Sequence, residues 1–175
     1  MKLIEKTLNE KTIYEGSFLK LIKQEVLLPD GNIAKRDILR HPGAVAIIAF
    51  KDENTVVMVE QYRKAIDRVL LEIPAGKLEK DEDILECARR ELEEEIGYTS
   101  NDIEYLGNFI TAPGFCDEVI HLFKAKNLKE KFAKGDDDEF INIKEFSLEE
   151  IKRLIKNGII VDCKTIAALQ YIKTY

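Results

Sequence analysis

The sequence contains few of the residues that mark secreted or membrane proteins. Its 175 residues include no Trp, three Cys and two His. The cysteines, Cys87, Cys116 and Cys163, show no paired spacing, which excludes a disulfide framework and is typical of reduced thiols in a cytoplasmic protein. Cys87 and Cys163 fall in or beside predicted helices, so we expect both to be small core residues.

Long apolar runs and a surplus of basic residues are also absent. No run approaches the ~20 apolar residues that span a membrane, and the N-terminus lacks the apolar core of a signal peptide. The formal net charge of −6 argues against a nucleic-acid backbone as the partner. A small phosphorylated substrate stays compatible with that charge, because bound metal ions can supply local positive charge. We therefore expect a cytoplasmic protein with no nucleic-acid and no membrane partner.

Turns and apolar runs predict a chain of strands followed by helices. Residues 1–40 are expected to form antiparallel strands around a turn at 29–32. The continuous apolar run 44–50 predicts a strand buried on both faces, and residues 55–62 complete a hairpin with it. Further strands are expected at 103–110, 119–125 and 140–146. Two C-terminal helices are expected, one at 147–156 with a Ser147–Glu150 capping box and one that begins at 162 or 164 and ends at 171.

A central helix is predicted over residues 83–96, a stretch without Gly or Pro and rich in strong helix formers. Acidic residues at 81–83 suit its N-terminus, and Gly97 is placed to end it. Apolar residues recur at helical spacing and predict a buried stripe. The stripe consists of Leu85, Ala88, Leu92 and Ile96.

Three carboxylates of this helix, Glu91, Glu94 and Glu95, stand at helical spacing and are therefore neighbours. Arg90 lies four residues from Glu94 and from Glu86, and can neutralise part of the charge. Glu91 and Glu95 have no basic residue at helical spacing. A hard cation such as Mg²⁺ takes oxygen ligands of this kind. A solvated acidic face is the alternative, but the glycines before and after the helix favour a metal site.

Two further kinds of group would complete a site that cleaves a phosphoanhydride. Arg63, at a strand end, can hold a phosphate bidentately, although an ordinary surface arginine is an equal alternative. Metal-assisted attack by water also needs a carboxylate that takes the proton of the water, on a loop that closes over the substrate. Glu139 and Glu118 are the candidates by their positions in loops.

Residues 76–98 resemble the Nudix box, Gly-x5-Glu-x7-Arg-Glu-U-x-Glu-Glu-x-Gly-U, in which U is a bulky apolar residue. Its fixed positions carry Gly76, Glu82, Arg90, Glu91, Leu92, Glu94, Glu95 and Gly97. Tyr98 at the last apolar position is a mild departure. The resemblance implies an α/β (α+β) protein with the Nudix fold. That fold is an α/β/α sandwich around a mixed β-sheet, here with an N-terminal antiparallel β-strand extension.

The flanking sequence resembles the ADP-ribose pyrophosphatase branch of this family. The matching segments are 41–45, 61–63, 71–76, 113–115 and 137–141, with Cys116 where Ser or Thr is usual. The resemblance implies hydrolysis of ADP-ribose to AMP and ribose 5-phosphate with Mg²⁺, or with Mn²⁺ as an alternative ion. Two alternatives stay open. One is a Nudix diphosphatase for another nucleoside-diphosphate sugar such as GDP-mannose, and the other is a module that binds ADP-ribose without cleaving it.

The resemblance also implies residue roles. Glu139 would be the catalytic base, while Arg90 and Glu82 would orient the metal ligands. Those ligands would be Glu91, Glu94, Glu95, the Ala75 carbonyl and, as an auxiliary, Glu118. Substrate contacts would come from Arg63, Phe18 (against adenine), Pro113, Gly114 and Phe115. Residues 41–175 would form the hydrolase domain. Residues 1–40 would form an extension that either packs on the same sheet or exchanges between the subunits of a homodimer, as in members of this branch.

Overall fold

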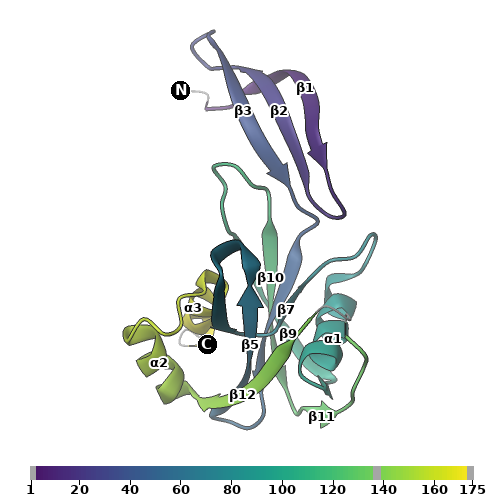
Figure 1. Ribbon diagram of the computed structural model, residues 1–175, viewed down its shortest axis with the longest axis vertical. Coiled ribbons are helices and arrows are strands. Elements are labelled where there is room, and N and C mark those ends of the chain that lie inside the picture. Colours follow the sequence, from purple (N-terminus) through teal and green to yellow (C-terminus); the bar gives the residue numbers. More distant parts are fainter. Residues whose placement is uncertain (1–2, 136–138, 173–175) are drawn as a thin grey trace. The chain divides into compact units, whose positions relative to one another are not determined.

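The computed structural model describes residues 3–135 and 139–172 (Figure 1). The chain divides into two compact units. The first combines Met1–Gly43 with Ile110–Val119, and the second combines Ala44–Phe109 with Ile120–Tyr175. No pattern in the sequence indicated that a segment from the middle of the chain would join the N-terminal strands.

The first unit is built on a three-stranded antiparallel sheet in the order β1-β2-β3. Its strands are β1 (Lys6–Glu15), β2 (Lys20–Leu27) and β3 (Ile33–Arg40). The predicted turn joins β2 to β3, and the Asp30 carboxylate accepts a hydrogen bond from the Asn32 amide across it. Leu39 in β3 pairs with Cys116, which is how the segment Ile110–Val119 is attached to this unit.

The second unit contains a mixed sheet in the order β12-β5-β4-β10-β9, with β6 on β5 and β7 on β4. The strand β10 runs parallel to β4, whereas β5, β7 and β12 make antiparallel pairs. The bounds are β4 (Ala44–Phe50), β5 (Thr55–Arg63), β6 (Arg68–Glu72), β7 (Ala75–Lys77), β9 (Asp102–Ile110), β10 (Val119–Lys126) and β12 (Ile141–Ser147). Shorter elements that the sequence did not predict are η1 (Lys64–Ile66), β8 (Tyr98–Thr99) and β11 (Lys129–Glu130).

Helices cover both faces of this sheet. Alternate residues of β4 face opposite ways, because side chains alternate along a strand. Ala46 and Ile48 pack in one core with α2 (Leu148–Lys156) and α3 (Cys163–Ile172), while Val45 and Ile47 pack in a second core with α1 (Ile84–Glu95). The predicted α/β/α sandwich is therefore confirmed, as is a strand at 44–50 buried on both faces (Figure 1). No helix among the described residues could cross a membrane.

The helix ends follow the predicted signals. Asp83 caps α1 by accepting hydrogen bonds from the amides of Leu85 and Glu86, and Gly97 follows the helix with φ +71°, in the region that glycine adopts without strain. The capping box at the start of α2 is confirmed. The expectation for Cys163 is wrong. Cys87 is buried in the α1 core, but Cys163 is exposed at the first residue of α3.

Candidate active site

Two carboxylates of α1 are buried at the point where the helix meets β7. Glu91 and Glu95 are each 6% exposed. The backbone amide of Ala75 donates a hydrogen bond to Glu95 Oε2 at 2.9 Å, and Arg90 Nη1 donates to Glu91 Oε1 at 2.7 Å. The structure therefore brings together Glu91, Glu95 and Ala75, which the sequence predicted as metal ligands.

Arg90 lies between three carboxylates, those of Glu82, Glu91 and Glu94. Its Nε donates to Glu82 Oε1 at 2.9 Å, and its Nη1 donates to Glu94 Oε2 at 2.9 Å as well as to Glu91. Glu91 has no basic residue at helical spacing, as expected, but the adjacent arginine folds back onto it, a contact that the spacing did not predict. The predicted neutralisation of Glu86 by Arg90 is wrong, since Glu86 binds Arg89 at 2.5 Å.

The pKa values of these groups separate into two kinds. The hydrogen bonds from Arg90 lower the pKa of Glu82 to about 2, so this carboxylate is ionised. Burial raises the pKa of Glu91 to about 7 and that of Glu95 to about 8, and the charge of Glu139 adds to both increases. Two buried carboxylates with too little positive charge nearby require either a proton or a cation.

Gly76 makes the close packing of Glu91 possible. A Cβ built on Gly76 would lie 1.8 Å from Glu91 Oε1 and 1.9 Å from its Cδ. Only glycine leaves room for the carboxylate against β7, where Gly76 pairs with Val45 of β4. The hard oxygen donors and this cradle fit a divalent cation such as Mg²⁺.

The predicted ligand set is not assembled in full. Within residues 3–135 and 139–172, no three His, Cys, Asp or Glu side chains are grouped so that they could hold a metal ion. Glu94 is held by Arg90, so it would have to leave that hydrogen bond to join Glu91 and Glu95. Glu139 is exposed, and its neighbours at 136–138 in the predicted acidic loop lie outside the described residues.

Arg63 is held by a carboxylate that sequence reasoning missed. Its Nε and Nη2 donate to the two oxygens of Glu72 at 2.9 and 2.7 Å. Glu72 is 1% exposed and also accepts a hydrogen bond from Lys164 Nζ. A charged residue inside the apolar run 70–74 was the signal that could have pointed to Glu72.

The remaining predicted residues lie in the first unit. The Phe18 ring packs edge-to-face on His41, with centroids 5.8 Å apart. Glu118 accepts a hydrogen bond from Thr111 Oγ1 at 2.7 Å, and its Oε1 lies 3.6 Å from His41 Nε2. Pro113, Gly114 and Phe115 form an exposed turn in the same segment.

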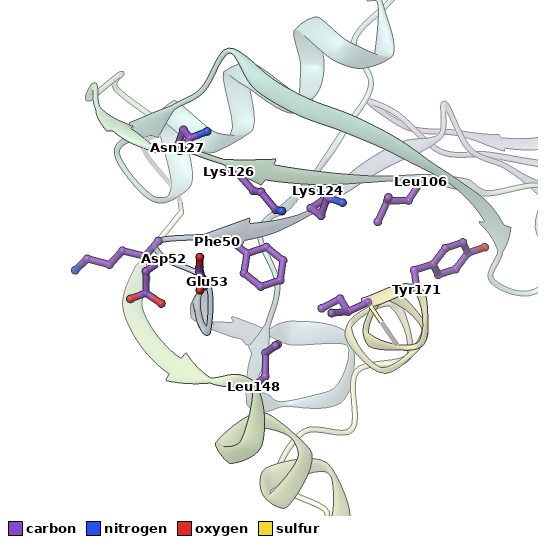
Figure 2. A pocket seen from close by; sticks show the side chains of 11 residues that line it. Phe50, Asp52, Glu53, Leu106, Lys124, Lys126, Asn127, Leu148 and Tyr171 are labelled. Carbon is purple, nitrogen blue, oxygen red and sulfur yellow. The ribbon is translucent and has the colours of Figure 1, made fainter. Parts of the chain in front are cut away.

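A separate cavity of about 590 Å³ opens on the face of the sheet that carries α2 and α3 (Figure 2). Phe50 and Leu148 contribute apolar side chains to it, and Lys124 and Lys126 extend into it from β10. It includes none of the predicted site residues. Because α1 covers the opposite face of the sheet, we place the candidate active site at the α1 carboxylates.

Family models match both parts of the chain. The NUDIX domain matches residues 40–167, and the nucleoside diphosphate sugar hydrolase N-terminal domain matches residues 5–39. The chain belongs to the Nudix family. The buried glutamates, Arg90 and Gly76 are therefore the Nudix box of this protein, as the sequence pattern predicted.

Several characterised relatives are similar over nearly their whole length. The chain is 51% identical to the methanol dehydrogenase activator of Bacillus methanolicus, covering 97% of this chain and 92% of the relative. It is 43% identical to the ADP-ribose pyrophosphatase of Bacillus subtilis, covering 98% and 94%. A crystal structure of an ADP compounds hydrolase aligns with a TM-score of 0.86 at 19% identity, covering 97% of this chain and 92% of that one, and shows the same fold.

Proposed function

We propose that this protein hydrolyses the diphosphate bond of ADP-ribose, giving AMP and ribose 5-phosphate, with Mg²⁺ or Mn²⁺ at the α1 carboxylates. The observation that carries the proposal is the pair of buried glutamates, Glu91 and Glu95, packed against Gly76. Similarity to an ADP-ribose pyrophosphatase along nearly the full chain supports the choice of substrate.

The metal ligands would be Glu91, Glu95 and the Ala75 carbonyl, joined by Glu94. When bound, the ion neutralises the diphosphate and makes a water molecule more acidic. Glu82 holds Arg90 through two hydrogen bonds, at 2.9 and 3.1 Å, so Arg90 keeps a fixed position when Glu94 turns away from it. Glu82 and Arg90 would thereby orient the metal ligands, as residues that hydrogen-bond to ligands do in metal sites.

Glu139 would act as the base. It would take a proton from water as the water oxygen attacks phosphorus and the bond from that phosphorus to the bridging oxygen breaks. Arg63 would bind phosphate or the terminal ribose. Its Nε and Nη2 are engaged by Glu72, but Nη1 has no hydrogen-bond partner among the described residues. The guanidinium is thus oriented while one donor group stays available.

The remaining roles stay predictions that rest on the resemblance. They concern the first unit, in which Glu118 would be the auxiliary ligand and Phe18, Pro113, Gly114 and Phe115 would contact substrate. We also propose a homodimer in which residues 1–40 contribute to the contact between subunits. Every residue of β1 is exposed in the single chain, which supports such a contact. The proposed location is the cytoplasm.

AMP release from ADP-ribose with Mg²⁺ tests the activity, run beside GDP-mannose and with EDTA as the control. Rapid release from ADP-ribose that EDTA abolishes is expected. A preference for GDP-mannose would replace the substrate, and that alternative is supported by 32% identity to the GDP-mannose pyrophosphatase of Cronobacter sakazakii. Binding of ADP-ribose without any cleavage would indicate a recognition module, which the retention of Glu91, Glu94 and Glu95 in the box argues against.

A second candidate function follows from the relative named methanol dehydrogenase activator. The chain would then raise the rate of a methanol dehydrogenase as well as hydrolysing a nucleotide. Adding the purified protein to a methanol dehydrogenase assay, with and without Mg²⁺, tests this. An unchanged dehydrogenase rate would limit the function to hydrolysis.

A further inference from the structure

The first turn of α3 is bonded to the strand segment that leads into the active site. Thr165 is fully buried. Its hydroxyl accepts a hydrogen bond from the backbone amide of Ile73 at 3.0 Å and donates to Asp162 Oδ2 at 2.6 Å. The two bonded residues, Ile73 and Thr165, are 92 positions apart in sequence, so the contact fixes α3 to this segment rather than closing a local turn.

The neighbouring residue of α3 binds the carboxylate that holds Arg63. Lys164 Nζ donates to Glu72 Oε2 and lies 3.1 Å from Asp162 Oδ2. The Lys164 side chain is 12% exposed. Arg63 and Lys164 together provide two positive charges for one buried carboxylate, and a buried carboxylate without such partners is strongly unfavourable. Lys164 therefore helps to keep Glu72 ionised in its contact with Arg63.

The residue that Thr165 binds, Ile73, lies two positions before Ala75 of the candidate active site. Ile73 precedes Pro74, whose carbonyl accepts a hydrogen bond from the Ile47 amide at 2.8 Å. Ala75 follows, and its amide donates to Glu95 Oε2 at 2.9 Å. The backbone from 73 to 75 is thus fixed by Thr165, by β4 and by the α1 carboxylate in turn. A displacement of the backbone at Ile73 would therefore also displace Ala75 and Gly76, which follow it by two and three residues.

We propose that Lys164 and Thr165 are positioning residues for the hydrolysis, although neither belongs to the Nudix box. Thr165 fixes the backbone that presents Ala75 and Gly76 to Glu91 and Glu95. Lys164 fixes Glu72 and, through it, the orientation of Arg63. The proposal rests on the proposed function for its kinetic consequences, but its structural part can be measured without activity.

The two residues are expected to affect different kinetic constants. Thr165→Val keeps the shape of the side chain but leaves the Ile73 amide unpaired. It should lower kcat about 10-fold with little change in KM, because partners of this outer kind typically contribute 10–100-fold. Thr165→Ser restores the hydroxyl and should recover kcat. Lys164→Met should raise KM for ADP-ribose about 10-fold, since Arg63 loses its fixed orientation toward the anionic substrate.

Two control variants separate positioning from loss of stability or charge. Ala168→Gly weakens the same helix at a buried residue that packs in the same core as Ile73 but whose side chain has no polar group, so the substitution removes no hydrogen bond. Lys152→Met removes an exposed lysine that pairs only with Glu149 within α2, among the described residues. Neither variant should change kcat or KM, even if Ala168→Gly lowers the melting temperature as much as Thr165→Val does.

Hydrogen–deuterium exchange supplies a readout that does not depend on activity. The peptide covering 73–77 should exchange faster in Thr165→Val than in wild type, and Thr165→Ser should restore protection. Unchanged exchange in Thr165→Val, or an equal loss of kcat in Ala168→Gly, would overturn the proposal. If wild type releases no AMP from ADP-ribose, the proposed substrate fails, while the exchange experiment still decides whether Thr165 positions this segment.

Discussion

Gly76→Ala provides a direct test of the close contact between β7 and α1. The added Cβ would lie 1.8 Å from Glu91 Oε1, whereas real Cβ atoms are essentially never closer than 3.0 Å to such a neighbour. Glu91 or the β7 backbone must therefore move by about 1 Å or more, and a misplacement of this size can cost about 10²-fold in rate. We expect kcat for AMP release to fall at least that much.

The cost in stability should be smaller than the cost in activity. Overpacking a tight contact typically costs about 1–3 kcal/mol, and Glu91 can turn away from β7 while the helix stays in place. Thermal unfolding with and without Mg²⁺ measures both effects. The variant should remain folded, and Mg²⁺ should leave its melting temperature unchanged, whereas we expect Mg²⁺ to raise the melting temperature of wild type.

Gly135→Ala is the matched control for this substitution. Neither glycine has a positive φ. The closest neighbour of a Cβ at Gly135 would be the Glu94 carbonyl oxygen at 3.5 Å, an ordinary van der Waals contact. Gly135→Ala should therefore keep kcat within about twofold. A folded Gly76→Ala variant with wild-type kcat would refute the argument that Glu91 must pack against this glycine.

Three further outcomes are expected. Glu95→Gln should abolish turnover while the circular dichroism spectrum stays native, and an unchanged rate would refute its assignment as a metal ligand. Glu139→Gln should lower kcat by ~10²–10⁴-fold if Glu139 is the base; a small effect would leave that role to Glu118 or to no single residue. In EDTA, the free energy of unfolding by urea should fall as the pH rises from about 5 to 8. The reason is that the pKa of Glu95 is raised from 4.5 to about 8, so the native state holds a proton that the unfolded chain has released. Glu95→Gln should flatten this slope, and a slope unchanged by the substitution would assign the effect to other groups.

Local patterns predicted the elements around the site well. The apolar run 44–50 became the central strand, and the acidic start and glycine end of α1 matched the expected helix. These features depend on residues close in sequence, whose spacing decides their structure. The Nudix box could be found for the same reason, because most of it lies on a single loop and helix.

The contacts that sequence reasoning missed depend on side-chain direction or on distant segments. Helical spacing pairs residues three or four apart, so it did not suggest that Arg90 would bind the adjacent Glu91. Glu72 and Lys164 are 92 positions apart, and nothing in either local pattern links them. The apolar residues that follow Cys163 favour a core position for it. Cys163 is however the first residue of α3 and is exposed there, and its place in the sequence does not show which way its side chain points.

The position of β4 between β5 and β10 has a consequence for how the protein is made. Its antiparallel neighbours β5 and β7 both precede α1 in sequence, so one edge of β4 can pair once residues 55–77 have left the ribosome. The other edge must wait for β10, a parallel partner that ends at Lys126. At a synthesis rate of ~5–20 residues per second, the wait lasts several seconds. During that time, a wholly apolar strand presents an unpaired edge to the cell, and such an edge exposes the nascent chain to aggregation unless chaperones protect it.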